Sequence, residues 1–144
     1  MTEFSDDLAI EHLAGQVLDT SLPRAEWTHA AHFALALWAL RLRPELAEPE
    51  AFRAIIVALN GAHGTPDTDS SGYHHTITVA SLDAARSILL GFGKDEPLVD
   101  VLAALVDGPL GRSDWILSYW SRDRLFSVAA RRDWIEPDLA PLPW

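Results

Sequence analysis

Apolar residues recur at helical spacing from the first segment of the chain onward. A first helix is predicted before the break at Leu22-Pro23, with Ser5 as its N-cap and two aspartates in its first turn. Its apolar stripe consists of Leu8, Ile10, Leu13, Val17 and Leu18. This helical spacing of apolar residues predicts an amphipathic helix.

A second helix is predicted from Thr28, a good N-cap, to the region before Pro44. Between Ala30 and Leu40 this segment is apolar on nearly every side, apart from His32. A helix that is apolar all round has to be surrounded by other elements. We therefore expect the second helix to lie in the centre of the molecule.

The rest of the chain also carries helical signals, and no run alternates as a half-buried strand would. A third helix is predicted to begin near Pro49, a fourth to run from Tyr73 to Leu90, and a fifth to begin at Pro97. Two shorter helices are predicted after these, one between Asp114 and Trp120 and one from Ser121 or Ser127 to Trp134. Gly61 is the expected end of the third helix. The pattern predicts one all-α domain over residues 1–144, a bundle of five to seven helices with residues 136–144 packed on it as an extended tail.

One polar segment, Asn60 to Tyr73, interrupts this helical pattern. It is rich in Gly, Pro, Asp, Ser and Thr, which is typical of a loop. Loops of this length are uncommon inside small domains and often have a function. We expect this one to cover the mouth of a pocket, with the Asn60 amide turned back onto a helix end or the loop backbone.

Composition narrows the classes of function. Of 144 residues, 49% are hydrophobic and 22% charged, and the formal net charge is -10. An acidic surface disfavours nucleic acid and anionic membranes as partners. There are no cysteines, which excludes disulfides, thiolate metal sites and cysteine nucleophiles. The acidic N-terminal segment has no signal-peptide pattern, so a cytoplasmic location is expected.

Histidine is the residue type that points to chemistry. Five of the six histidines fall between positions 29 and 75. If the second and fourth helices run parallel, their starts bring His29, His32 and His74 together. Imidazole binds divalent zinc, iron and nickel well, so these three are the predicted metal ligands. His75 and His63 are the candidates for acid–base catalysis or for an extra ligand.

Two interpretations remain open at this stage. The first is a metal-dependent enzyme that hydrolyses or oxidises a small molecule in a histidine-lined pocket. The second is a non-catalytic module whose bundle binds a ligand, a protein partner or a second copy of itself as a homodimer. A His-x-x-His pair alone does not decide between them, because helix-start histidines are also found as capping or core residues. No phosphate loop, dinucleotide fingerprint or nucleophile elbow is present.

Several segments together resemble a family of small uncharacterised bacterial proteins. They are residues 26–32 (EWTHAAH), 60–62 (NGA), 71–78 (SGYHHTIT), 119–127 (YWSRDRLFS) and 134–139 (WIEPDL). The family pairs a Thr-His-x-x-His segment with a Gly-Tyr-His-Glu-Thr segment, and the resemblance covers the chain from about residue 20 onward.

The resemblance implies a location for the site and brings no established activity. Thr28, Asn60 and Tyr73 match the family pattern and are expected to contact a bound ligand or cofactor. His75 departs from the pattern, because the family has glutamate there. This exchange of a carboxylate for an imidazole implies either a changed ligand set or a position that is not a strict ligand.

Overall fold

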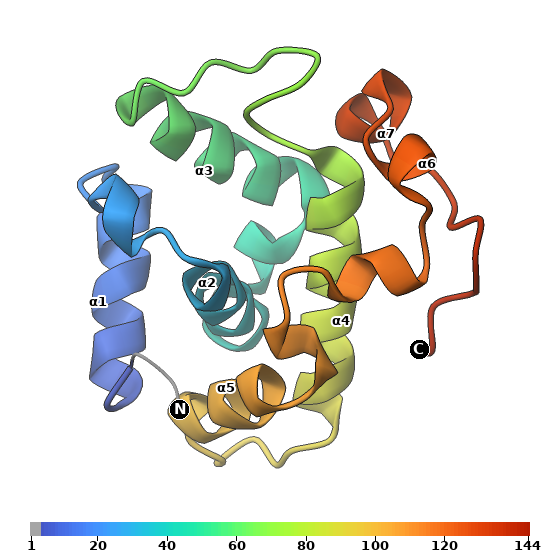
Figure 1. Ribbon diagram of the computed structural model, residues 1–144. Coiled ribbons are helices and arrows are strands. Elements are labelled where there is room, and N and C mark those ends of the chain that lie inside the picture. Colours follow the sequence, from blue (N-terminus) through green and yellow to red (C-terminus); the bar gives the residue numbers. More distant parts are fainter. Residues whose placement is uncertain (1–3) are drawn as a thin grey trace.

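The computed structural model describes residues 4–144, and within that range it is all-α, with seven α-helices and no strand (Figure 1). The helices are α1 Asp7–Leu18, α2 His29–Leu42, α3 Pro49–Ala62, α4 His75–Leu90, α5 Leu98–Asp107, α6 Arg122–Leu125 and α7 Val128–Arg132. Four short 3₁₀ turns join them: η1 Arg24–Glu26, η2 Pro44–Ala47, η3 Pro109–Gly111 and η4 Trp115–Ser118. The predicted fold class is confirmed.

Helix α2 lies in the centre of the bundle, as its apolar pattern predicts. Figure 1 views it almost end-on, with α1, α3, α4 and α5 around it. Leu35 and Leu37, on different sides of the helix, are both at most 1% exposed. Thr28 caps the start of α2, its side chain accepting a hydrogen bond from the Ala31 N–H.

Three helix boundaries differ from the prediction, each by one to two residues. Asp6 rather than Ser5 caps α1, because its carboxylate accepts the Ala9 N–H. Helix α3 continues through Gly61 to Ala62, since that glycine keeps a helical backbone there. Helix α4 begins at His75 rather than Tyr73, because His74 occupies the N-cap position.

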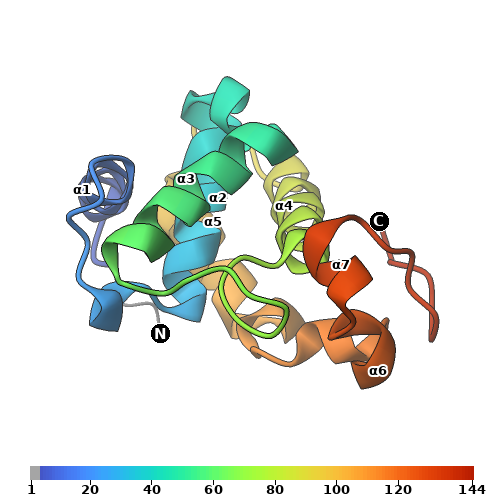
Figure 2. The same ribbon diagram turned by 90° about the horizontal axis from the view of Figure 1, so that it is seen from above.

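Helices α2 and α4 start on the same side of the molecule, because α3 returns the chain between them (Figure 2). His29 and His32 of α2 and Ile77 and Ser81 of α4 line one hollow, which shows that the first turns of the two helices meet. The helix arrangement on which the histidine hypothesis rested is therefore present.

The C-terminal third of the chain closes the other side of this region. Ser121 and Ser127 both act as N-caps, so two short helices, α6 and α7, form where one was expected. The tail then folds back along the bundle. The Leu139 N–H donates to the Tyr119 carbonyl, and the Asp138 carboxylate accepts from the Ser121 N–H and hydroxyl. Across residues 4–144, none of the helices has the length and apolar character that crossing a membrane requires.

Candidate functional site

A hollow of about 410 Å³ lies between the first turns of α2, those of α4, and the segment that carries η4 and α6. We call it the histidine hollow. Its polar lining residues are His29, His32, Ser81, Ser113, Asp114 and Arg122. Its apolar walls include Phe33, Ile77, Trp115, Leu125 and Phe126. A mostly apolar cavity with a few placed polar groups is the usual form of a small-molecule site.

His32 has one ring nitrogen fixed and one free. Its Nδ1 lies 2.7 Å from the Thr28 carbonyl oxygen, which can only accept, so Nδ1 carries the proton. The ring also stacks on Trp27, with centroids 3.7 Å apart. Nε2 has no hydrogen-bond partner among residues 4–144 and belongs to a side chain that lines the hollow. His32 therefore offers a lone pair of fixed orientation.

Burial keeps His32 neutral. Loss of solvation lowers its pKa from the ordinary value of 6.5 to about 4. The hydrogen bond to the Thr28 carbonyl opposes this shift, and the neighbouring His29 adds to it. At neutral pH the ring is thus an uncharged acceptor.

His29 and Arg122 complete the polar part of the hollow. The His29 Nε2–H donates to the Leu110 carbonyl at 2.7 Å, and its ring packs edge-on against Phe33. The guanidinium of Arg122 makes no ion pair or hydrogen bond within the described chain, although this residue lines the hollow. The cavity therefore combines a neutral acceptor with a free cation.

His74, the third predicted metal ligand, does not line this hollow, and both of its ring nitrogens are engaged. Nε2–H donates to the Leu125 carbonyl at 2.7 Å, and Nδ1 accepts the Ile77 N–H that starts α4. Burial lowers its pKa, the Leu125 hydrogen bond opposes that shift, and Arg131 adds to it. With no lone pair left over, the neutral His74 has none to give to a metal.

The predicted three-histidine metal site is therefore not formed. Among the described residues, no three His, Cys, Asp or Glu side chains are grouped closely enough to hold an ion. The physical reason is that each ring donates a hydrogen bond to a backbone carbonyl, which fixes its orientation. The acceptors are the carbonyls of Leu110 for His29, Thr28 for His32 and Leu125 for His74. Only His29 and His32 share the hollow.

His75 and Tyr73 form a separate pair on the side of α4 that faces α3. The Tyr73 hydroxyl lies 2.8 Å from His75 Nδ1, and the Glu50 carboxylate lies 4.0 Å from Nε2. Burial lowers the pKa of His75, and Arg53 lowers it further, while Glu50 and Asp133 oppose the shift. Burial raises the pKa of Tyr73. Neither residue lines the histidine hollow, so the expected role of His75 beside the predicted metal ligands has no geometric basis.

His63 and Asn60 also lie away from the hollow. His63 ends α3, and its Nε2–H donates to the Leu22 carbonyl at 2.7 Å, which ties α3 to the segment after α1. The Asn60 carbonyl accepts the Thr65 N–H, whereas its amide side chain makes no hydrogen bond within residues 4–144. Thr28 acts through its capping hydroxyl and its carbonyl and does not line the hollow. Thr28, Asn60 and Tyr73, which were expected to contact a ligand, are thus absent from the lining of the histidine hollow, and their ligand contacts stay a prediction.

The loop after α3 is not a lid over the hollow, because no residue from 60 to 73 lines it. Asp67 accepts the Tyr73 N–H, and Arg131 donates to the Gly72 and Tyr73 carbonyls. Asp69 pairs with Arg132 at 2.8 Å. These contacts hold the loop against α7 instead (Figure 2).

Sequence reasoning missed the far wall of the hollow, which comes from Ser113 to Phe126. Arg122 is the main omission. It lies within residues 119–127, a segment whose sequence predicts a short helix and contains no motif typical of a binding site. An arginine directly after a serine N-cap is the available signal, since such a residue sits in the first helical turn beside the cap.

A comparison with known protein families, curated proteins and solved structures finds no match to this chain. The resemblance to a bacterial family therefore stays a prediction.

Proposed function

We propose that the protein binds a small organic molecule in the histidine hollow, and that His32 Nε2 accepts a hydrogen bond from it. The observation that carries this proposal is the fixed tautomer of His32, with Nδ1–H on the Thr28 carbonyl and Nε2 free in an otherwise largely apolar cavity. His32 Nε2 makes no hydrogen bond within residues 4–144, so a ligand that supplies an O–H or N–H to it gains one inside the hollow.

The pKa of His32 favours binding over proton transfer. A general base works best when its pKa lies near the working pH. With a pKa of about 4, His32 lies roughly three units below neutral pH, and its protonation there costs about 4 kcal/mol. The same neutrality leaves it well suited to accept a hydrogen bond. This supports the ligand-binding interpretation over an acid–base enzyme.

The position of Arg122 indicates that the ligand carries an anionic group. Its unpaired guanidinium can hold a carboxylate with two parallel hydrogen bonds. Phe33, Ile77 and Leu125 supply apolar contact. The ligand class that fits is a compact molecule with one carboxylate, an apolar or aromatic body and one hydrogen-bond donor.

The three hydroxybenzoate isomers are suitable probes, because each carries a carboxylate, a ring and a phenolic donor at a different spacing. We expect at least one isomer to bind, as followed by NMR titration. Its methyl ester, which lacks the anion, and its methoxy analogue, which lacks the donor, should each bind about 10-fold more weakly.

Two variants test which side chain contacts which group of the ligand. Arg122→Gln should weaken the acid but not the ester, and His32→Phe should weaken the hydroxyl compound but not its methoxy analogue. Arg86→Gln is the matched control, because Arg86 is an exposed arginine paired with Asp83 and lies outside the hollow. If none of the isomers binds, or if both variants bind normally, the proposal is wrong. Zn²⁺ or Ni²⁺ that perturbs His29 and His32 together would favour the metal-dependent alternative instead.

A further inference from the structure

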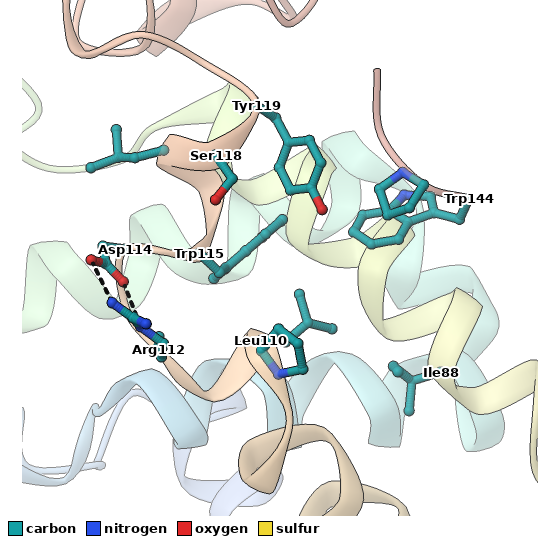
Figure 3. Close-up of a pocket in the computed structure, with 11 residues that line it drawn as sticks. Ile88, Leu110, Arg112, Asp114, Trp115, Ser118, Tyr119 and Trp144 are labelled. Atoms are coloured by element: carbon teal, nitrogen blue, oxygen red, sulfur yellow. Dashed lines mark hydrogen bonds and ion pairs between the residues drawn. The ribbon is translucent and has the colours of Figure 1, made fainter. Parts of the chain in front are cut away.

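A second hollow, of about 490 Å³, lies on the other side of η4 (Figure 3). Three aromatic side chains, Trp115, Tyr119 and Trp144, line it together with Ile88, Leu110 and Ser118. We call it the aromatic hollow. Trp115 lines both hollows, so η4 forms the partition between them. The site proposed here is independent of the histidine hollow.

The three rings stand at the corners of a nearly equilateral triangle. The ring centroids are 6.2 Å apart for Trp115 and Tyr119, 6.0 Å for Trp115 and Trp144, and 6.4 Å for Tyr119 and Trp144. Their planes are inclined to each other by 50–63°. One atom placed over the middle of such a triangle lies within about 6 Å of all three rings, which is the range of cation–π attraction.

Polar groups on this lining lack protein partners. The Trp115 indole N–H, the Tyr119 hydroxyl and the Ser118 hydroxyl make no hydrogen bond within residues 4–144. Trp115 is only 7% exposed, and its N–H lies on the part of the ring that is open to the hollow. By contrast, Trp120 and Trp134 both use their N–H groups, on the Ile135 carbonyl and the Glu136 carboxylate. The aromatic hollow therefore holds unused hydrogen-bonding groups beside its aromatic wall.

The lining of the aromatic hollow carries no net positive charge that would repel a cation. The protein carries a formal net charge of -10, which concentrates cations at its surface. At the rim, Arg112 makes two contacts of 3.2 and 3.4 Å with Asp114, visible as dashed lines in Figure 3, so its own charge is largely compensated. The Tyr119 hydroxyl points toward the space between Trp115 and Trp144 (Figure 3).

We infer that the aromatic hollow binds the alkylammonium group of a small cationic molecule, with the ammonium seated over the three rings, which pack against one another, and the Trp115 N–H on an acceptor in the rest of the ligand. Electron-rich ring faces attract such a group, and its methyl groups gain apolar contact at the same time. A neutral molecule of the same shape gains only the apolar part.

Choline and 3,3-dimethyl-1-butanol test this inference, because they share one shape and differ by the charge on the central atom. By isothermal titration calorimetry, we expect choline to bind about 10-fold more tightly than the alcohol. Trp144→Ala and Tyr119→Leu should each weaken choline by about 10-fold, whereas Tyr119→Phe, which keeps the ring, should have little effect. Circular dichroism checks that each variant is folded; Trp144 is 40% exposed, so its loss is tolerable.

Trp134→Phe is the matched control, because Trp134 is a partly buried tryptophan outside both hollows. Its choline affinity should equal that of the wild type. His32→Phe should also bind choline normally, which separates this site from the histidine hollow. Equal affinity for choline and the alcohol, no binding of choline, or unchanged binding to Trp144→Ala would each overturn the inference.

Discussion

His32 keeps one ring nitrogen available, whereas His74 uses both, although each stands at or near a helix start. At the N-terminal end of a helix, backbone N–H groups and the helix dipole disfavour a positive charge, so a neutral imidazole is stable there. His74 is the N-cap itself and meets the free Ile77 N–H. His32 lies one turn into α2, where it reaches back to the Thr28 carbonyl and leaves Nε2 unpaired.

The tautomer and the charge of His32 can be measured directly. In ¹⁵N-labelled protein at neutral pH, we expect one histidine with an Nδ1–H and a deprotonated Nε2 that stays neutral until the pH approaches about 4. The physical reason is desolvation together with the fixed Thr28 hydrogen bond. Long-range ¹H–¹⁵N spectra recorded across a pH titration measure both properties. His32→Gln should remove this one signal; a His32 ring that becomes charged near pH 6 would contradict the prediction.

Residue-level sequence reasoning could place the histidines near one another but could not assign their bonds. The His-x-x-His spacing fixes the positions of His29 and His32 on α2, and both do line one hollow. The carbonyl that holds His29 comes from Leu110, 81 residues later, and the one that holds His74 is 51 residues later. Contacts at such separations depend on packing that no local pattern encodes. For that reason the sequence places His29 and His32 in one hollow but does not bring His74 to them, and the metal ligand set stays a prediction.

At the scale of single elements, the start of α4 depends on an imidazole in place of the usual Ser, Thr, Asp or Asn. His74 both caps α4 through Nδ1 and ties it to α6 through the Leu125 carbonyl. Its own carbonyl accepts from the Thr78 hydroxyl. One side chain thus links a helix start to a segment from the C-terminal third of the chain.

Removal of this link should destabilise the protein. His74→Ala loses the cap and leaves the buried Leu125 carbonyl without a donor, so we expect a loss of about 2–4 kcal/mol in the free energy of unfolding. His74→Asn keeps an acceptor oxygen for the cap, and about half of the loss should return. Urea denaturation of the three proteins makes the comparison. Equal losses for alanine and asparagine would show that capping by this side chain contributes nothing.

For the segment between α3 and α4, the local sequence predicts a loop but not the side of the bundle on which the loop lies. Its composition correctly predicted a loop, and Gly72 fits this, because its φ of +84° is a backbone conformation that glycine adopts readily. A side chain there would also collide with Asp67, whose carboxylate accepts the Tyr73 N–H. The side of the bundle on which the loop lies is set by Arg131 and Arg132 of α7. Nothing within residues 60–73 indicates those partners.

At the scale of the whole molecule, the histidines couple stability to pH. Burial is the largest cause of the lowered pKa of His32, His74 and His75. In the unfolded chain each ring regains its ordinary pKa of 6.5. Below that pH the unfolded state binds protons that the folded state rejects, so acid favours unfolding.

The resulting prediction is a loss of stability as the pH falls from about 6.5 toward about 4, the folded pKa of His32. Each histidine that stays neutral in the folded state contributes up to about 1.4 kcal/mol per pH unit over its own window. Above pH 6.5 these groups are neutral in both states, so their contribution is constant there. Guanidinium unfolding curves at several pH values measure the slope. His32→Gln has no ring to protonate in either state, so its slope should be shallower by up to about 1.4 kcal/mol per pH unit. If the variant and the wild type lost stability in parallel, His32 would not be held neutral by the fold, and the proposed acceptor in the histidine hollow would lose its basis.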